Sequence, residues 1–246
     1  MQPAGWRPPA RLAARETLAL LRVYKLAGRP VKQPPASRTV PVLLVPGFMA
    51  GDWSLVPMAR WLRQRGYRTY PAGVRMNADC TTVLVERLER LLVGIAEQAG
   101  PVAIVGHSRG GTLAKLVAVR RPELVRGIVT LAAPNINPLA ASTAVLNQVE
   151  LLLRLNRRGL RGLLTEDCVR GECAERTAAH LNGPFPRHIA YTSVYSRTDG
   201  IVEWQACLDP HAEHVEVTTT HNGMGSNAGV YRIVERRLRP LESRQR

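Results

Sequence analysis

The sequence predicts an α/β protein whose sheet is mostly parallel, doubly wound and covered by helices on both faces. From residue 40 onward, short β-rich apolar runs alternate with stretches of helical periodicity. Several of these runs are apolar throughout, as expected for strands buried on both sides. A length of 246 residues and an apolar content of 45% suit a single domain with a substantial core.

Strands and helices are predicted in alternation along residues 40–238. The predicted strands cover residues 40–45, 67–72, 102–105, 127–132, 189–195 and 214–219. The predicted helices cover residues 53–65, 82–98, 109–120, 144–155, 202–208 and 225–238. Residues 135–188 break this rhythm, and we interpret them as a helical cap inserted over one end of the sheet.

The first 39 residues are predicted to form a basic helix and a linker that precede the main domain at 40–246. They hold eight Arg or Lys residues against a single Glu. A helix over residues 10–26 would place Arg11, Arg15, Arg22 and Lys25 on one face. This helix either packs on the domain with a solvated basic stripe or lies on an anionic lipid surface. Residues 30–39, with three prolines, are predicted to be the linker.

The charge distribution narrows the classes of partner. The formal net charge is +15, of which +7 lies in residues 1–40 and +4 in residues 232–246. Nucleic acid is not expected, because only three of the 34 basic residues are Lys and aromatic residues make up only 5%. The basic termini are compatible with peripheral contact with an anionic membrane.

With neither a secretory signal nor a membrane-spanning run in the sequence, we expect a cytoplasmic location, with or without membrane association. The oligomeric state is not indicated.

The cysteines leave their redox state open. Cys80, Cys168, Cys173 and Cys207 lack the CxxC spacing of zinc sites, so no metal is expected. Cys168 and Cys173 are close enough in sequence to form a local disulfide, whereas a cytosolic location favours reduced thiols.

The motif that indicates a catalytic function is Gly106-His107-Ser108-Arg109-Gly110. The pattern G-x-S-x-G alone is weak, but a predicted strand leads into it and a predicted helix follows it. That setting is typical of a nucleophile elbow, with the serine at the apex of a sharp turn. Ser108 is therefore the candidate nucleophile; the alternative is a glycine-rich turn with an incidental serine.

A serine nucleophile requires a base, and three of the six histidines follow the best acid candidate. His211 and His214 precede the last predicted strand, whereas His221 follows it. Because the carboxyl ends of parallel strands share one rim of the sheet, His221 is predicted to lie near Ser108. His107 is expected to point away from the site.

The acid that orients the base is predicted by the same argument. Asp199 follows the strand at 189–195, at its carboxyl end, with Glu203 as the alternative. Asp209 precedes the last strand and is expected on the opposite rim.

Two backbone N–H groups are expected to stabilise an oxyanion. One belongs to Arg109, at the start of the helix that follows Ser108. The other belongs to Phe48, in the loop after the first predicted strand, with Met49 as the alternative. Asp52 is expected to cap the next helix.

Residues 40–239 resemble α/β-hydrolases, most closely small bacterial lipase- or esterase-like members. Three blocks carry the resemblance: VPVLLVPGFMAGDW, VGHSRGGTLAKLVAVRRPELV, and VYSRTDGIVEW followed by THNGMGSN. The resemblance implies a Ser108–His221–Asp199 triad and an oxyanion loop at Phe48. The N-terminal hairpin usual in this family is not evident, and the basic helix stands in its place.

The resulting expectation is a serine hydrolase that cleaves a small carboxylic ester, including lipid-like esters, through an acyl-Ser108 intermediate. This mechanism needs neither a metal nor an organic cofactor. An acyltransferase or a thioesterase would use the same residues. An alternative of another class is a non-catalytic protein that has a hydrolase scaffold and binds membrane surfaces.

Overall fold

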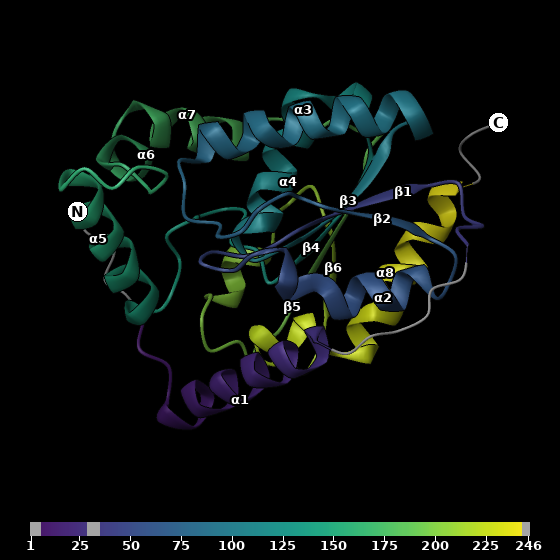
Figure 1. Ribbon diagram of the computed structural model, residues 1–246. Helices are drawn as coiled ribbons and strands as arrows, with labels where there is room; N and C mark the ends of the chain where they lie inside the picture. Colours follow the sequence, from purple (N-terminus) through teal and green to yellow (C-terminus); the bar gives the residue numbers. More distant parts are fainter. Residues whose placement is uncertain (1–5, 29–34, 243–246) are drawn as a thin grey trace.

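The computed structural model describes residues 6–28 and 35–242, and much of the predicted linker lies outside these ranges. Six parallel strands form one sheet in the order β2-β1-β3-β4-β5-β6 (Figure 1). The strands are β1 (Pro41–Val45), β2 (Arg68–Pro71), β3 (Val102–His107), β4 (Val125–Leu131), β5 (Ala190–Tyr195) and β6 (Glu213–Glu216). The predicted fold class is confirmed. Because every strand runs in the same direction, their carboxyl ends meet along one rim.

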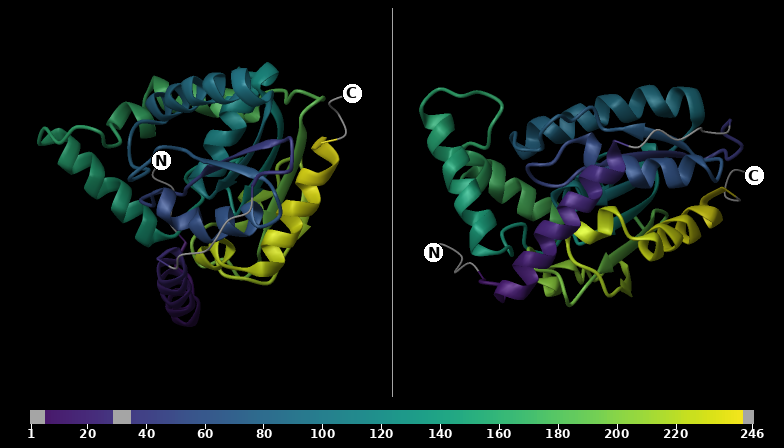
Figure 2. Two further views of the ribbon diagram at one scale, coloured as in Figure 1. Left: turned by 45° about the vertical axis from the view of Figure 1, so that its right-hand side comes forward. Right: turned by 60° about the horizontal axis from the view of Figure 1, so that its bottom comes forward.

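Helices cover both faces of this sheet, as Figures 1 and 2 show. The helices of the sheet region are α2 (Val56–Arg63), α3 (Thr81–Ala99), α4 (Arg109–Arg120) and α8 (Ala228–Glu242). α3 and α4 pack on one face, where Ile104 of β3 enters a core with Leu88 of α3. α2 and α8 pack on the other face, where Val105 of β3 meets Met58 and Val234. The central strand is thus buried on both sides, as its apolar sequence predicted.

Two predicted elements differ from the structure near the carboxyl end of β5. The predicted helix at 202–208 is only a 3₁₀ turn, Trp204–Cys207. Val202 instead forms an isolated antiparallel bridge with Ala141, which keeps the chain extended there. The last strand ends at Glu216 rather than at residue 219. The chain leaves the sheet there, and the Thr219 carbonyl accepts hydrogen bonds from Ser196 and Thr198 in the loop after β5.

The N-terminal helix α1 (Ala10–Ala27) packs beside α2, on the face of the sheet covered by α2 and α8 (Figure 2). Glu16 and Val23 are its two buried residues. The Arg60 guanidinium of α2 donates to the carbonyls of Leu26 and Ala27, both at 2.6 Å, and so caps the carboxyl end of the helix. The helix is therefore tied to the domain at its carboxyl end.

The outer face of α1 is exposed and carries both basic and apolar side chains. Leu18, Leu21 and Tyr24 are among its most exposed apolar residues. No helix within residues 6–28 and 35–242 combines the length and apolar character needed to cross a membrane.

Three helices lie between β4 and β5, in the segment predicted as an insertion. They are α5 (Thr143–Arg157), α6 (Glu166–Arg170) and α7 (Glu172–Asn182). Leucines of α5 and of the loop after it form a small separate core against Ala78. These leucines are Leu152, Leu153, Leu163 and Leu164. Part of this segment's apolar content is thus explained by packing alone.

A disulfide joins Cys80, just before α3, to Cys168 in α6. The local pairing of Cys168 with Cys173 and the fully reduced state are both wrong. Cys173 is buried as a free thiol 3.7 Å from the Cys80 sulfur, and Cys207 is also free and buried. The sequence spacing gave no sign of this pair, because the two cysteines are 88 residues apart.

Asp209 has a structural partner on the side of the sheet covered by α4. Its carboxylate forms a buried ion pair with Lys115 of α4 and accepts a hydrogen bond from the Tyr191 hydroxyl. Lys115 also donates to the Leu181 carbonyl. A buried pair of this kind is costly to break from one side, because the remaining charge is left uncompensated.

Candidate functional site

Ser108 occupies a strained turn between β3 and α4. Its backbone has φ 52° and ψ −128°, a left-handed φ that is unusual for a residue other than glycine. Its N–H donates to the Leu131 carbonyl at 2.8 Å, which fixes the turn against β4. A Cβ at Gly106 would overlap the Gly110 carbonyl, and a Cβ at Gly110 would overlap the carbonyls of Val45 and Pro46. The two glycines therefore let the backbone pass close enough to raise Ser108 above the rim.

Asp199 and His221 are paired at the same rim. The Asp199 Oδ2 atom lies 2.7 Å from His221 Nδ1, and both side chains are buried. The other oxygen of Asp199 accepts the N–H groups of Ile201 and Val202, each at 2.8 Å. The carboxylate is thus fixed by its own loop and aimed at the imidazole.

The alternative residues lie elsewhere. Glu203 belongs to the segment that pairs with Ala140, to whose carbonyl its own N–H donates. His214 contacts the Asp209 carbonyl, and His211 stacks on Phe185. His211 and His214 therefore sit at the opposite end of β6 from His221.

The environment of His221 favours its protonated form. Burial lowers its pKa, but the charge of Asp199, its hydrogen bond and the charge of Glu16 outweigh burial and raise the pKa above the usual 6.5. A histidine held against a carboxylate in this way is well suited to accept a proton.

His107 lies against His221 rather than pointing away, so that expectation from the sequence is wrong. The two rings are 4.7 Å apart, and His107 Nε2 donates to the His221 carbonyl at 3.1 Å. Burial and the neighbouring His221 lower the pKa of His107 to about 3. His107 is therefore neutral at working pH and supports the loop that carries His221.

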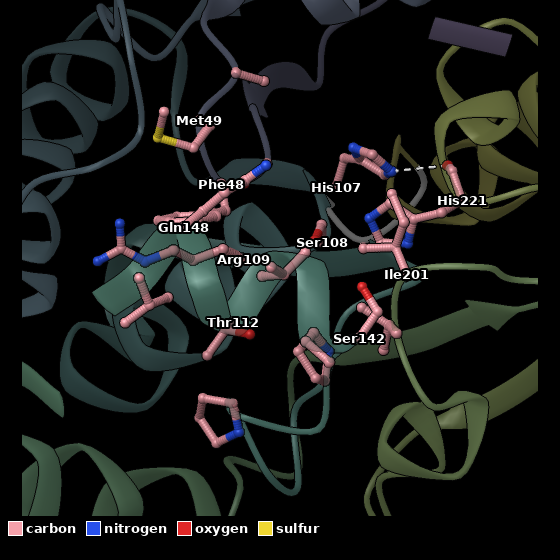
Figure 3. A pocket seen from close by; sticks show the side chains of 18 of the residues that line it. Phe48, Met49, His107, Ser108, Arg109, Thr112, Ser142, Gln148, Ile201 and His221 are labelled. Atoms are coloured by element: carbon pink, nitrogen blue, oxygen red, sulfur yellow. Dashed lines mark hydrogen bonds between the residues drawn. The ribbon is translucent and has the colours of Figure 1, made fainter. Parts of the chain in front are cut away.

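One pocket of about 690 Å³ brings these groups together. Figure 3 shows Ser108 near its centre, with His107 and His221 on one side and Phe48 and Arg109 on the other. The Ser108 hydroxyl forms no hydrogen bond with the His221 ring in the part of the chain that is described. Such contacts are often long in the absence of substrate and tighten when it binds.

The loop after β1 presents one backbone donor beside Ser108. The Met49 N–H already donates to the Asn77 carbonyl at 3.0 Å, which argues against Met49 as the oxyanion donor. The Phe48 N–H has no acceptor within residues 6–28 and 35–242. Arg109 is the first residue of α4, where the backbone N–H lacks a partner within the helix.

Asn77 holds this loop in place, a role that the sequence did not predict. Its side chain donates to the Pro46 carbonyl at 2.8 Å and accepts from the Arg109 guanidinium at 2.8 Å. Arg109 also donates to the Asp79 carbonyl and the Thr81 hydroxyl. Burial lowers the pKa of Arg109 to about 10, an effect that the charge of Asp79 partly opposes. The Arg109 side chain thus stabilises the segment from Asn77 to Thr81, while its backbone N–H lies at the pocket.

Two acidic residues play parts that the sequence did not predict. Asp52 is not a helix cap: its carboxylate accepts the N–H groups of Ala72 and Val74 and fixes the loop after β2. Glu16, the only acidic residue among the first 39, lines the pocket from α1. Its isolation in a basic segment was the one available signal that it has a specific role.

Among the described residues, one group could supply several metal ligands. The sulfurs of Cys80, Cys168 and Cys173 all lie within 4.8 Å of one another. Two of these sulfurs are joined in the disulfide, so they are not free thiolates. The chemistry that the pocket can support is therefore that of a hydroxyl, an imidazole–carboxylate pair and backbone donors.

The sequence profile of a family described as "Alpha/beta hydrolase family" matches residues 42–240. Solved structures share this fold at low sequence identity. The mature lipase BlEst2 of Bacillus licheniformis is 15% identical with a TM-score of 0.62, over 87% of this chain and 96% of that one. A lipase-esterase related protein of Clostridium acetobutylicum is 12% identical with a TM-score of 0.55, over 84% of this chain and 97% of that one.

A third similar structure comes from work on the metagenome-derived lipolytic enzymes LipS and LipT. It is 17% identical with a TM-score of 0.58, over 85% of this chain and 96% of that one. At these identities the likeness establishes the fold, and any activity has to be argued from the residues of the site.

Proposed function

Because the chain belongs to the α/β hydrolase family, we propose that it is a serine hydrolase that cleaves carboxylic esters through an acyl-Ser108 intermediate. One observation carries the proposal most directly. The 2.7 Å contact between Asp199 and His221 lies at the same rim as Ser108, whose hydroxyl shares a pocket with the imidazole. In this assignment Ser108 is the nucleophile, His221 the base and Asp199 the residue that orients the base.

The reaction proceeds in two half-reactions, and in each of them His221 accepts a proton and then releases it. The Ser108 oxygen attacks the ester carbonyl while His221 Nε2 takes its proton, and His221 then returns that proton to the departing alcohol. Water attacks the acyl-Ser108, with His221 again accepting a proton and then restoring it to Ser108. The backbone N–H groups of Phe48 and Arg109 stabilise the oxyanion in both steps.

The pocket lining favours an ester with an apolar acyl group. Residues from α1 and from the segment between β4 and β5 contribute aliphatic side chains around the rim. They include Leu20, Val145, Leu146, Val149 and Leu164, and Ile201 from the loop after β5 adds to them. We further propose that residues 135–188 act as a cap on the domain formed by 40–246, with the acyl chain lying beneath it. The lipolytic descriptions of the similar structures agree with this substrate class.

A fluorophosphonate probe tests the assignment of Ser108. We expect the folded wild type to be labelled at a single site, and the Ser108→Ala variant to lose both the label and hydrolysis of p-nitrophenyl butyrate. Loss of a serine nucleophile lowers kcat by about 10⁶-fold in a comparable triad. Ser142, which lines the same pocket, supplies the matched control as Ser142→Ala, which should still be labelled. An unlabelled wild type, or equal labelling of Ser108→Ala, would refute the proposal.

The acyl-length profile tests the substrate class. Each methylene buried in the pocket contributes at most about 0.8 kcal/mol, or roughly a fourfold gain in kcat/KM. We therefore expect p-nitrophenyl octanoate to be a better substrate than the butyrate. Leu146→Ser should weaken this preference, whereas Leu151→Ser, on the exposed side of the same helix, should leave it unchanged. A steep loss of activity beyond four carbons would exclude a lipid-like substrate.

A further inference from the structure

Glu16 is a buried acidic residue on a helix whose other charged residues are all basic and exposed. It lies in the middle of α1, and its side chain faces the end of the sheet where His221 lies. α1 precedes residues 42–240, the part of the chain that matches the family profile. A charged carboxylate is buried at such a position only when its hydrogen bonds compensate for lost water.

Three backbone N–H groups supply that compensation. Glu16 Oε1 accepts from Gly200 at 2.9 Å and from His221 at 2.7 Å, while Oε2 accepts from Asn222 at 2.8 Å. The Asn222 amide also donates to the Glu16 carbonyl at 3.3 Å. One carboxylate therefore joins the loop after β5 to the loop that follows β6.

The residues it holds are those of the Asp199–His221 pair. Gly200 directly follows Asp199, and the Glu16 carboxylate contacts the backbone of His221 itself. A Cβ at residue 200 would lie 3.0 Å from Glu16 Cγ, so a larger residue would crowd the Glu16 side chain. Oε1 is shared by the two loops, so a shift of α1 would disturb the hydrogen bonds of both loops at once.

We propose that Glu16 is a positioning residue that fixes the separation and orientation of Asp199 and His221. The proposal rests on the function proposed above, because it assigns Glu16 a role in the same reaction. It makes α1 a structural part of the active site rather than an appended basic helix. Val23 lies about two turns further along α1. It packs against Gly225 and so holds the helix against the same loop.

Glu16 also contributes to the electrostatics of the base. The ionisable groups that face His221 are Asp199 from the loop after β5, His107 from β3 and Glu16 from α1. Cys207 stands behind them, where burial and, to a lesser extent, the charge of Asp199 raise the pKa of its thiol. The charge of Glu16 raises the pKa of His221, in the same direction as that of Asp199. Removing it should lower this pKa, whereas a general loss of stability that leaves Asp199 in contact with His221 should not.

The test compares Glu16→Gln with Glu16→Asp. Gln keeps the size and removes the charge, whereas Asp keeps the charge and shortens the reach by one methylene. For each variant we would measure kcat and KM on p-nitrophenyl butyrate, the rate of fluorophosphonate labelling and the pH dependence of kcat/KM. Arg15→Gln, next to Glu16 but exposed, is the matched control.

Both Glu16 variants should lose up to about 10²-fold in kcat, with little change in KM, because small displacements of catalytic groups have effects of this size. In Glu16→Gln the acid limb of the pH profile should also move to lower pH, while Glu16→Asp keeps the wild-type limb. Arg15→Gln should match the wild type in every measurement.

Contrary results separate this inference from the function it rests on. If the wild type is labelled at Ser108 and both Glu16 variants keep its kcat and pH profile, the role of Glu16 is wrong and the serine hydrolase assignment stands. A loss of kcat with an unmoved acid limb in folded Glu16→Gln would also overturn it. If Glu16→Gln does not fold, Glu16→Asp decides, since an undiminished kcat there refutes the positioning role. An unlabelled wild type would overturn both proposals.

Discussion

The two sides of the pocket are built in different ways. On one side, a five-residue motif forms the turn that carries Ser108, and its Gly106 and Gly110 make room for that turn against the neighbouring strands. On the other side, the Asp199–His221 contact spans 22 residues, and the Glu16 carboxylate reaches Gly200 and His221 across 184 and 205 residues. A short motif can therefore encode the first side, whereas the second depends on three separate elements meeting.

The two sides of the pocket should also be sensitive to different kinds of substitution. The turn at Ser108 relies on the absence of side-chain atoms, so added volume should disturb it. The Asp199–His221 side relies on hydrogen bonds and charge, so replacing a charged group by a neutral one of equal size should disturb it. The two variants below each make one of these changes and leave the other condition intact.

Asp199→Asn should have the larger effect of the two. It keeps the shape of the side chain but removes the charge that stabilises the imidazolium and holds the Nδ1–H tautomer of His221. We expect kcat to fall on the order of 10⁴-fold, with KM and the free energy of unfolding changed far less. Steady-state kinetics on p-nitrophenyl butyrate and urea unfolding would measure these quantities.

The pH profile gives a second measurement on the same variant. The base acts in its neutral form, so wild-type kcat/KM should rise with pH through a midpoint above 6.5, the direction in which the pKa of His221 is shifted. In Asp199→Asn, burial lowers this pKa and the two largest opposing contributions are lost, so the midpoint should move to lower pH. Glu203→Gln is the control, and a comparable loss of activity there would reverse the choice between the two acids.

The fold was predictable because its signals are local. Apolar runs such as residues 102–105 predicted the strands, and the direction of the chain placed their carboxyl ends at one rim. The same reasoning predicts neighbouring positions for Asp199 and His221, and the two side chains are in contact. Asp209 was correctly separated from them, since it pairs with Lys115.

What the sequence did not indicate depends on pairs of distant residues. Nothing near Cys80 predicts that Cys168 would be its partner, and nothing near Asn77 predicts that it holds the loop after β1. Glu16 belongs to the same class, because its three partners lie about 200 residues further along the chain. The prediction of a helix at 202–208 was wrong for a related reason. Val202 forms a bridge with Ala141, and the local periodicity of the sequence does not indicate this long-range pairing.

Gly110→Ala should break the side of the pocket that the first variant leaves intact. Both Gly110 in α4 and Gly94 in α3 lie in helices, where alanine is intrinsically favoured by about 0.5–1 kcal/mol. At Gly94 a Cβ would meet no atom within 4 Å, so Gly94→Ala should raise the free energy of unfolding by that amount and leave kcat unchanged. At Gly110 the Cβ would overlap the carbonyls of Val45 and Pro46, which forces β1 and the loop that follows it away from α4. Overpacking of this kind costs about 1–3 kcal/mol, and we expect kcat to fall with it because Phe48 moves relative to Ser108. Urea unfolding and ester hydrolysis on the two variants would show it; a Gly110→Ala protein as stable and as active as Gly94→Ala would mean that the turn at Ser108 does not depend on this close approach.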